Sequence, residues 1–140
     1  MVRCGDGSDA AHLAHGGFAV HVMDISSAHF TSVERYGVRT HCASATEFWL
    51  FENGSFDSVM DVLCYRGEPD PDKRAFYRSE LKRVLKRGGY YLISLQSAPG
   101  AREAAAREFA GFEIVASGES EGRLHGTMAI RVLNLIMKRK

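Results

Sequence analysis

The sequence predicts an α/β protein: a doubly wound, mostly parallel sheet with helices on both faces and an antiparallel strand pair at the carboxyl end. Two observations lead to this class. Segments with helical periodicity alternate with short apolar strands along most of the 140 residues, and such alternation favours parallel pairing. Two strand-like segments then follow one another at the end of the chain, which favours an antiparallel pair at a sheet edge.

Composition sets limits on the class of protein. A chain of 140 residues is long enough for one domain, here residues 1–140, with its own core. Its net charge of +1 provides no general attraction to nucleic acid or acidic membranes. No apolar run reaches the roughly 20 residues of a membrane span. The three cysteines are odd in number and widely spaced, which fits neither a disulfide framework nor a zinc site and predicts a reducing, cytoplasmic location.

In the first half of the chain, a short helix is expected to begin at Ser8 and end at Gly16. Residues 18–23 form an apolar strand that ends at Asp24. A second helix is expected from Ser26 or Ser27 to about residue 37, and a short strand over residues 38–42 follows it. A long connection rich in aromatic residues then leads to a turn at residues 53–54.

The second half begins with a strand over residues 56–63. Asp72 can cap the most regular helix of the chain, which is expected to end at the Gly88-Gly89 pair. A buried strand over residues 90–95 and an alanine-rich helix from Pro99 to about residue 109 come next. Residues 112–115 and 128–137 are the two closing strands, which we expect to pair in antiparallel fashion.

Four segments carry a resemblance to a known family. They are a glycine loop, Cys4-Gly5-Asp6-Gly7; a strand ending in an acid, His21-Val22-Met23-Asp24; a strand entrance, Gly54-Ser55-Phe56-Asp57-Ser58-Val59; and a helix, glycine turn and strand, Leu81-x-x-Val84-Leu85-Lys86-x-Gly88-Gly89-Tyr90. In this order and spacing they resemble the class I S-adenosylmethionine (SAM) dependent methyltransferases. The resemblance implies a sheet of order 3-2-1-4-5-7-6 with strand 7 antiparallel.

The resemblance also implies a cofactor site for SAM. Gly5 and Gly7 would let the backbone approach the cofactor closely, with helix N-terminal amides facing its carboxylate. Asp24, at the end of the second strand, would accept hydrogen bonds from the ribose hydroxyls. The residues expected to bind the cofactor are Cys4, Gly5, Asp6, Gly7, Asp24, Ile25, Ala45 and Thr46.

Asp61 and Tyr65 are the candidate catalytic residues, because they lie near the carboxyl end of the fourth strand, where ligands gather in open α/β sheets. Asp61 could act as a general base or hold a substrate amine, and it could equally be a buried capping carboxylate. The expected acceptor is a small molecule or a protein. The Asn/Asp-Pro-Pro-Tyr motif of many nucleic-acid methyltransferases is absent, which disfavours nucleic acid. No histidine spacing indicates a metal site.

Two departures from the family pattern lie at the start of the chain. Met1 falls where the family has an acid, and Arg3 falls where it has the first glycine, so the first strand is largely missing. We therefore expect weak SAM binding, little turnover, and either closure of the flanking strands or a homo-oligomer. Two alternatives remain open: a non-catalytic methyltransferase-like binding or dimerisation module, and an NAD-binding oxidoreductase using Gly5-x-Gly7 and Asp24.

Overall fold

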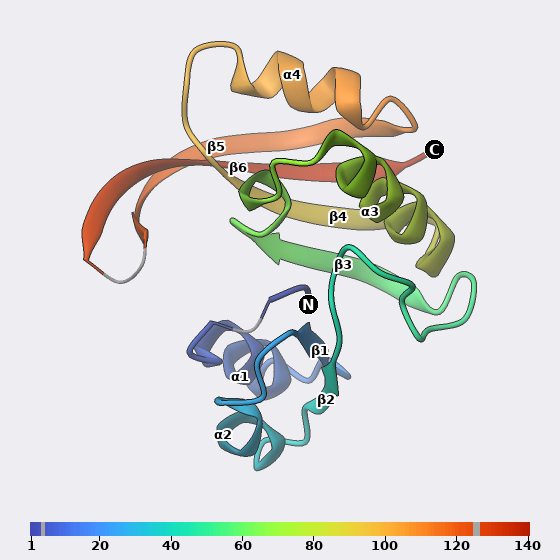
Figure 1. Cartoon of the computed structure of the whole chain (residues 1–140), viewed down its shortest axis with the longest axis vertical. Helices are drawn as coiled ribbons and strands as arrows, with labels where there is room; N and C mark the ends of the chain where they lie inside the picture. Colours follow the sequence, from blue (N-terminus) through green and yellow to red (C-terminus); the bar gives the residue numbers. More distant parts are fainter. Residues whose placement is uncertain (4, 125–126) are drawn as a thin grey trace. The chain divides into compact units, whose positions relative to one another are not determined.

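The computed structural model describes residues 1–3, 5–124 and 127–140, and it has the α/β character that the sequence predicts. The chain forms two compact units, Met1–Leu50 and Phe51–Lys140. We refer to them as the amino-terminal and carboxyl-terminal units. Figure 1 shows the helices and strands of both.

The amino-terminal unit alternates helix and strand. Its elements are α1 (Ser8–His15), β1 (His21–Asp24), α2 (Phe30–Glu34) and β2 (Arg39–Cys42). The strands pair in parallel from His21 opposite Arg39 to Asp24 opposite Cys42. Their core is built from small side chains plus one phenylalanine: Ala10, Val20, Val22, Phe30, Val33 and Val38. Alternation along β1 places Val22 in this core and turns His21 and Met23 to the other face.

The first residues of the chain add a stub of a third parallel strand. Val2 forms a parallel bridge with Met23. The Arg3 amide donates to the Met23 carbonyl at 2.8 Å, and the Met23 amide donates to the Met1 carbonyl at 3.0 Å. The expected remnant of the first strand is therefore present beside β1.

The carboxyl-terminal unit contains the longer elements. They are β3 (Phe56–Val62), the 3-10 turn η1 (Tyr65–Gly67), α3 (Pro71–Val84), β4 (Leu85–Gln96), α4 (Ala101–Glu108), β5 (Phe112–Leu124) and β6 (Met128–Arg139). The four strands form a sheet of order β3-β4-β6-β5. In Figure 1, α3 and α4 lie on one face of this sheet, and the hairpin of β5 and β6 extends beyond the end of β4.

The sheet pairings confirm one prediction and correct another. The closing strands are antiparallel, as predicted, and both are longer than expected. The description "doubly wound and mostly parallel" is not met: β1 with β2 and β3 with β4 are parallel, whereas β4 with β6 and β5 with β6 are antiparallel. The four-stranded sheet is mixed because β6 runs antiparallel to both of its neighbours, β4 and β5, whereas β3 and β4 are parallel.

Two helices begin at residues other than those predicted. Asp70, not Asp72, caps α3, because its carboxylate accepts from the amides of Asp72 and Lys73 while Pro71 occupies the first turn. The α2 helix begins only at Phe30 and has no side-chain cap. Among the helices described, none combines the length and apolar character that crossing a bilayer requires.

Candidate functional site

The glycine loop before α1 has the backbone geometry that the motif requires. Gly5 and Gly7 have φ angles of 56° and 87°, in the left-handed region that favours glycine. A Cβ added at Gly5 would have no atom within 4 Å, so the space beside this residue is open. Cys4, the fourth expected member of the loop, lies outside the described residues.

Asp6 has a local role in this loop. Its Oδ1 accepts from the Ser8 amide at 2.9 Å and from the Ser8 hydroxyl at 2.7 Å. The Ser8 amide, followed by the Ser8 hydroxyl, lowers the pKa of Asp6 from its usual value. A carboxylate at the start of a helix is also stabilised by the helix dipole. Asp6 therefore holds the entrance to α1, in place of the Ser8 cap that the sequence predicts.

The other expected cofactor residues follow the carboxyl ends of β1 and β2. Asp24 is half-buried, and its Oδ1 accepts from the Ser26 amide at 2.9 Å. Ile25 is exposed. The Ala43 amide donates to the Asp24 carbonyl at 3.0 Å, which places the segment after β2 beside Asp24. Three adjacent parallel segments, the strand stub, β1 and β2, thus carry the expected cofactor residues at their carboxyl ends. These residues are in the glycine loop after the stub, at Asp24 and Ile25 at the end of β1, and in the segment after β2.

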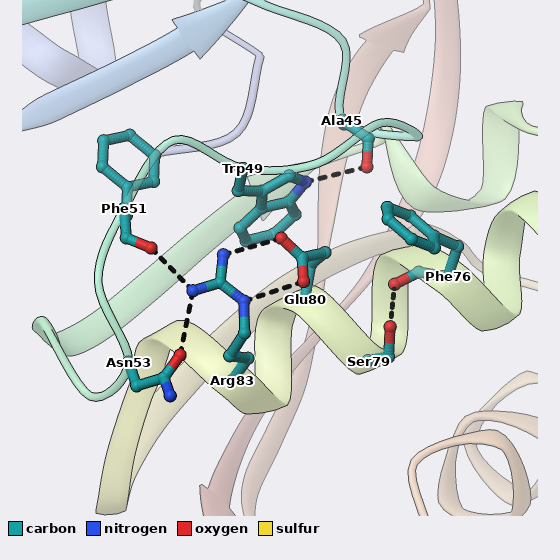
Figure 2. Close-up of polar contacts among 8 residues, drawn as sticks. All are labelled: Ala45, Trp49, Phe51, Asn53, Phe76, Ser79, Glu80 and Arg83. Atoms are coloured by element: carbon teal, nitrogen blue, oxygen red, sulfur yellow. Dashed lines mark hydrogen bonds and ion pairs between the residues drawn. The ribbon is translucent and has the colours of Figure 1, made fainter.

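The segment after β2 is closed by local hydrogen bonds. The Thr46 amide donates to the Ser44 hydroxyl at 3.2 Å. The hydroxyls of Ser44 and Thr46 lie 2.9 Å apart. The Ala45 carbonyl accepts from Trp49 Nε1 at 3.0 Å, as Figure 2 shows. Trp49 is buried and therefore packs as a structural residue.

Arg3 is the exception in this part of the site. Its φ angle is 65°, a left-handed conformation in a residue with a side chain. This conformation costs an L-residue roughly 1–2 kcal/mol. Arg3, which stands where the family motif has its first glycine, thus holds a backbone conformation that favours glycine.

These features fit an adenosyl cofactor with a carboxylate. The loop leaves open space beside Gly5 and leads directly into the amino terminus of α1. The Asp24 carboxylate is of the type that accepts hydrogen bonds from ribose hydroxyls. The cofactor would supply a methyl group already activated on a sulfonium sulfur. Such a reaction mainly needs positioning of two molecules by the protein.

In the carboxyl-terminal unit, Asp61 is fully buried and its carboxylate has several donors. Oδ1 accepts from the Cys64 amide at 2.8 Å, and Oδ2 accepts from the Tyr65 amide at 3.1 Å and the Tyr77 hydroxyl at 2.6 Å. Burial first, and then the charge of Asp61, raise the pKa of Tyr77 well above its usual value. Of the two roles predicted for Asp61, this geometry favours the capping carboxylate, which fixes the turn after β3.

Tyr65 is also buried, with its hydroxyl inside an ion-pair cluster. The hydroxyl donates to Glu108 Oε2 at 2.5 Å and accepts from Arg78. Burial and the bond to Glu108 raise the pKa of Tyr65 to about 12. Arg66 pairs with the other Glu108 oxygen at 3.0 Å. A phenol with this pKa is a poor general base near neutral pH.

Sequence reasoning missed the strongest ion pair of this unit. Arg83 Nε and an Nη donate to the two oxygens of Glu80 at 2.8 and 2.7 Å, and Glu80 is only 5% exposed. The other Nη of Arg83 donates to the Phe51 carbonyl at 2.6 Å and to Asn53 Oδ1 at 3.0 Å (Figure 2). This contact ties the turn before β3 to α3. The i,i+3 spacing of the two charges on a predicted helix was the available signal.

Fold and loop together define the class of protein. It is an α/β protein in which a glycine loop of the type that binds nucleotides precedes α1, and the next strand, β1, ends in the acid Asp24. Residues 2–89 match a family model described as "Methyltransferase domain". Because this match spans more than half of the chain, the protein belongs to the methyltransferase-domain family. No curated protein matches the sequence significantly.

Solved structures of similar fold include several methyltransferases. A SAM-dependent methyltransferase from Methanosarcina mazei has a TM-score of 0.82 and 18% identity, with 99% of this chain and 90% of that chain covered. The 1,6-didemethyltoxoflavin-N1-methyltransferase from Burkholderia thailandensis has a TM-score of 0.83 and 19% identity, with 98% and 68% covered. The N-methyltransferase NodS from Bradyrhizobium japonicum has a TM-score of 0.77 and 13% identity, with 99% and 75% covered.

Proposed function

We propose that the protein is a SAM-dependent methyltransferase acting on a small molecule or a protein. The observation that carries this proposal is the glycine loop with two left-handed glycines in front of α1, together with Asp24 at the end of the next strand, β1. Two neighbours, the Burkholderia and Bradyrhizobium enzymes, were solved with S-adenosylhomocysteine, which supports the same cofactor here. A fold resemblance at this identity does not identify the acceptor.

The proposed cofactor residues lie in the amino-terminal unit. Gly5 and Gly7 give the cofactor access to the backbone, while Asp6 holds the loop. Asp24 accepts from the ribose hydroxyls, and Ile25 beside it offers an exposed apolar side chain for the adenine. Ala45 and Thr46 flank the adenine from the segment after β2. Cys4 belongs to the same proposed set.

Asp61 and Tyr65 are proposed as residues that shape the acceptor side without exchanging protons with the substrate. Asp61 anchors the turn after β3, and Leu63 in this turn has a φ angle of 58°, a strained conformation of the kind found at functional sites. Tyr65 packs beneath the turn against Tyr77 and Phe109.

Calorimetric titration with SAM tests the cofactor role of Asp24. Asp24→Ala should weaken SAM binding by about 1–3 kcal/mol, the scale of hydrogen bonds to a charged group. Asp24→Asn is the sharper variant, because its amide oxygen can still accept from the Ser26 amide while the charge is lost. Asp57→Ala is the matched control, since the Asp57 carboxylate is exposed and pairs with Lys86 at the surface. Equal affinities of the wild type and both Asp24 variants would remove Asp24 from the site.

A non-catalytic binding module is the second candidate, and Arg3 favours it. An arginine at φ 65° places a cationic side chain where the family motif has no side chain at all. This candidate predicts no methyl transfer, whereas the methyltransferase proposal expects weak SAM binding with slow but measurable transfer. Measured methyl transfer to any acceptor would reject it. NAD titration in parallel tests the less favoured oxidoreductase reading.

Three further expectations accompany the main proposal. The two units act together as one domain, which is supported by a family model that spans parts of both. The protein forms a homo-oligomer, which light scattering over a dilution series tests. The location is cytoplasmic, and the free thiols of Cys42 and Cys64 are compatible with it.

A further inference from the structure

The net charge of +1 conceals an uneven distribution of charge between the two units. The amino-terminal unit contains five acidic and three basic residues, whereas the carboxyl-terminal unit contains 12 acidic and 15 basic residues. A local excess of one sign attracts a charged partner even where the net charge of the whole chain is small. The carboxyl-terminal unit is therefore the place where an anionic partner could bind.

Two cations lie at the end of the four-stranded sheet where β4 begins and β6 ends, on the right in Figure 1. Lys138 is exposed near the end of β6, and a Cβ built at Gly88 would lie 3.9 Å from its Cε. The half-buried Arg139 follows it and donates from its guanidinium to the Leu85 carbonyl. Both residues are therefore held by strand pairing and do not belong to a loose tail.

Two further cations reach the same end of the sheet from α3 and from a bulge in β4. Lys82 is in the last turn of α3, and its Nζ would lie 3.3 Å from a Cβ built at Gly111, just before β5. The pairing of β4 with β3 passes over residues 86–89, which form a bulge, and Arg87 is exposed within it. We call this set of four the basic rim: Lys82, Arg87, Lys138 and Arg139.

The carboxylates at this end of the sheet do not neutralise the basic rim. Asp57 and Glu80 are already paired with basic residues outside the rim, at 2.7 Å in both cases. Glu113 is exposed opposite Lys138, but among the described residues no ion pair includes a member of the rim. The dipole of α3 favours a cation at Lys82, but this effect falls off within the last turn of a helix and does not extend to β6.

An exposed aromatic ring adjoins the rim. Tyr90 is 43% exposed, and it lies opposite Lys138 in the pairing of β4 with β6. Lys138 Nζ is 5.9 Å from the centroid of the Tyr90 ring. Its other strand neighbour, Ser58, has a small side chain. Proteins that bind single-stranded nucleic acids combine cations for the phosphates with aromatic rings on which the bases stack.

From these observations we infer that the basic rim and Tyr90 bind a single-stranded nucleic acid. The rim holds the phosphodiester backbone by its charge, and Tyr90 stacks against a base. The rim is at the opposite end of β4 from its carboxyl end, and the nucleic acid is a docked partner and not the methyl acceptor. The inference stands independently of SAM binding.

Fluorescence anisotropy with the full chain tests the charge of the rim. The probes are labelled oligouridine and oligothymidine of about 12 nucleotides, within the usual size of such sites. We expect both to bind, and to bind more weakly as salt rises from about 50 to about 200 mM. Lys138→Gln and Lys82→Gln should each weaken binding about 5- to 10-fold at about 50 mM salt and reduce the slope of log affinity against log salt by about 0.7.

Lys73→Gln is the matched control, because Lys73 is exposed on the same helix as Lys82 but in its first turn. It should bind the probes within about twofold of the wild type, since no phosphate contact is lost. Equal losses in Lys73→Gln and Lys82→Gln would show that the probes respond only to net charge, and would overturn the inference. Absence of binding to both oligonucleotides at about 50 mM salt would also overturn it.

The aromatic contact separates a nucleic acid from other anionic partners. Tyr90→Ala should weaken binding of the oligonucleotides by about fivefold or more, whereas Tyr90→Phe keeps the ring and should bind like the wild type. Vesicles of phosphatidylcholine and phosphatidylserine, and polyglutamate, are titrated in parallel. Tighter binding to either of these than to the oligonucleotides, or equal binding of Tyr90→Ala and the wild type, would overturn the assignment to nucleic acid.

Discussion

The two units of this protein differ in the length of their strands and in the size of the side chains in their cores. The amino-terminal unit is held by two four-residue strands, a core of mostly small side chains and a loop in left-handed conformations. The carboxyl-terminal unit has strands of up to 13 residues and a core of contacting rings from Tyr65, Tyr77, Tyr91, Phe109 and Phe112. Ligand-binding segments are drawn from the less stable parts of a protein. The comparison is consistent with the cofactor site that we propose in the first unit, and it shows that the second unit has the more extensive aromatic core.

The largest expected effect is in the carboxyl-terminal unit, at Asp61. Asp61→Ala removes the carboxylate that accepts from the Tyr77 hydroxyl and from the Cys64 and Tyr65 amides, and should lower the free energy of unfolding by about 3–5 kcal/mol. Urea denaturation measures this change. Asp57→Ala should stay within about 0.5 kcal/mol of the wild type, because its carboxylate is exposed. If Asp61→Ala were as stable as this control, the buried carboxylate would not support the second unit.

Two smaller changes in the free energy of unfolding, of opposite sign, are expected in the glycine loop. Arg3→Gly relieves a left-handed conformation and should raise stability by about 0.5–1 kcal/mol after the entropic cost of glycine. Gly5→Ala introduces the same strain at φ 56° without any steric contact, and should lower stability by about 1 kcal/mol. The unfolding temperature should be higher than that of the wild type for Arg3→Gly and lower for Gly5→Ala. Destabilisation by Arg3→Gly would mean that contacts of the arginine side chain outweigh the backbone strain.

The smallest effect concerns a histidine pair of the amino-terminal unit. His21 Nδ1 lies 3.0 Å from His41 Nε2, and the rings are stacked. Burial first, and then neighbouring positive charges, lower the pKa of both rings from the usual 6.5; these charges are His41 and Arg39 for His21, and the amino terminus and Arg39 for His41.

The folded state binds protons at His21 and His41 less tightly than the unfolded chain does. The free energy of unfolding is therefore unaffected by this pair above pH 6.5 and falls as the pH drops below 6.5. Unfolding temperatures at pH 7.5 and 5.5 should show this loss, and His41→Gln should reduce it. His12→Gln, at an exposed position, is the control. An identical pH profile for wild type and His41→Gln would show that the pair does not couple protonation to folding.

Local signals in the sequence identified most elements but not their lengths. Alanine and leucine at helical spacing between Ser8 and Gly16 predicted α1, and the apolar run before Asp24 predicted β1. The strands β5 and β6 were found but underestimated, because residues 116–124 are polar and rich in glycine. Residues 116–124 form a strand because they pair with β6, and a partner strand cannot be recognised from local composition.

The sequence by itself determined the family, the glycine loop and the acid that follows the next strand, since these depend on residue types at short spacing. Only the tertiary structure decided the role of Asp61, because it brings Tyr77 and the turn after β3 onto one buried carboxylate. It also decided the hydrogen bonds that join Ser94, Asn134 and Ser120, which lie on three different strands. Such contacts join residues that are distant in the chain, and hydrogen bonding and burial fix them only once the strands have paired.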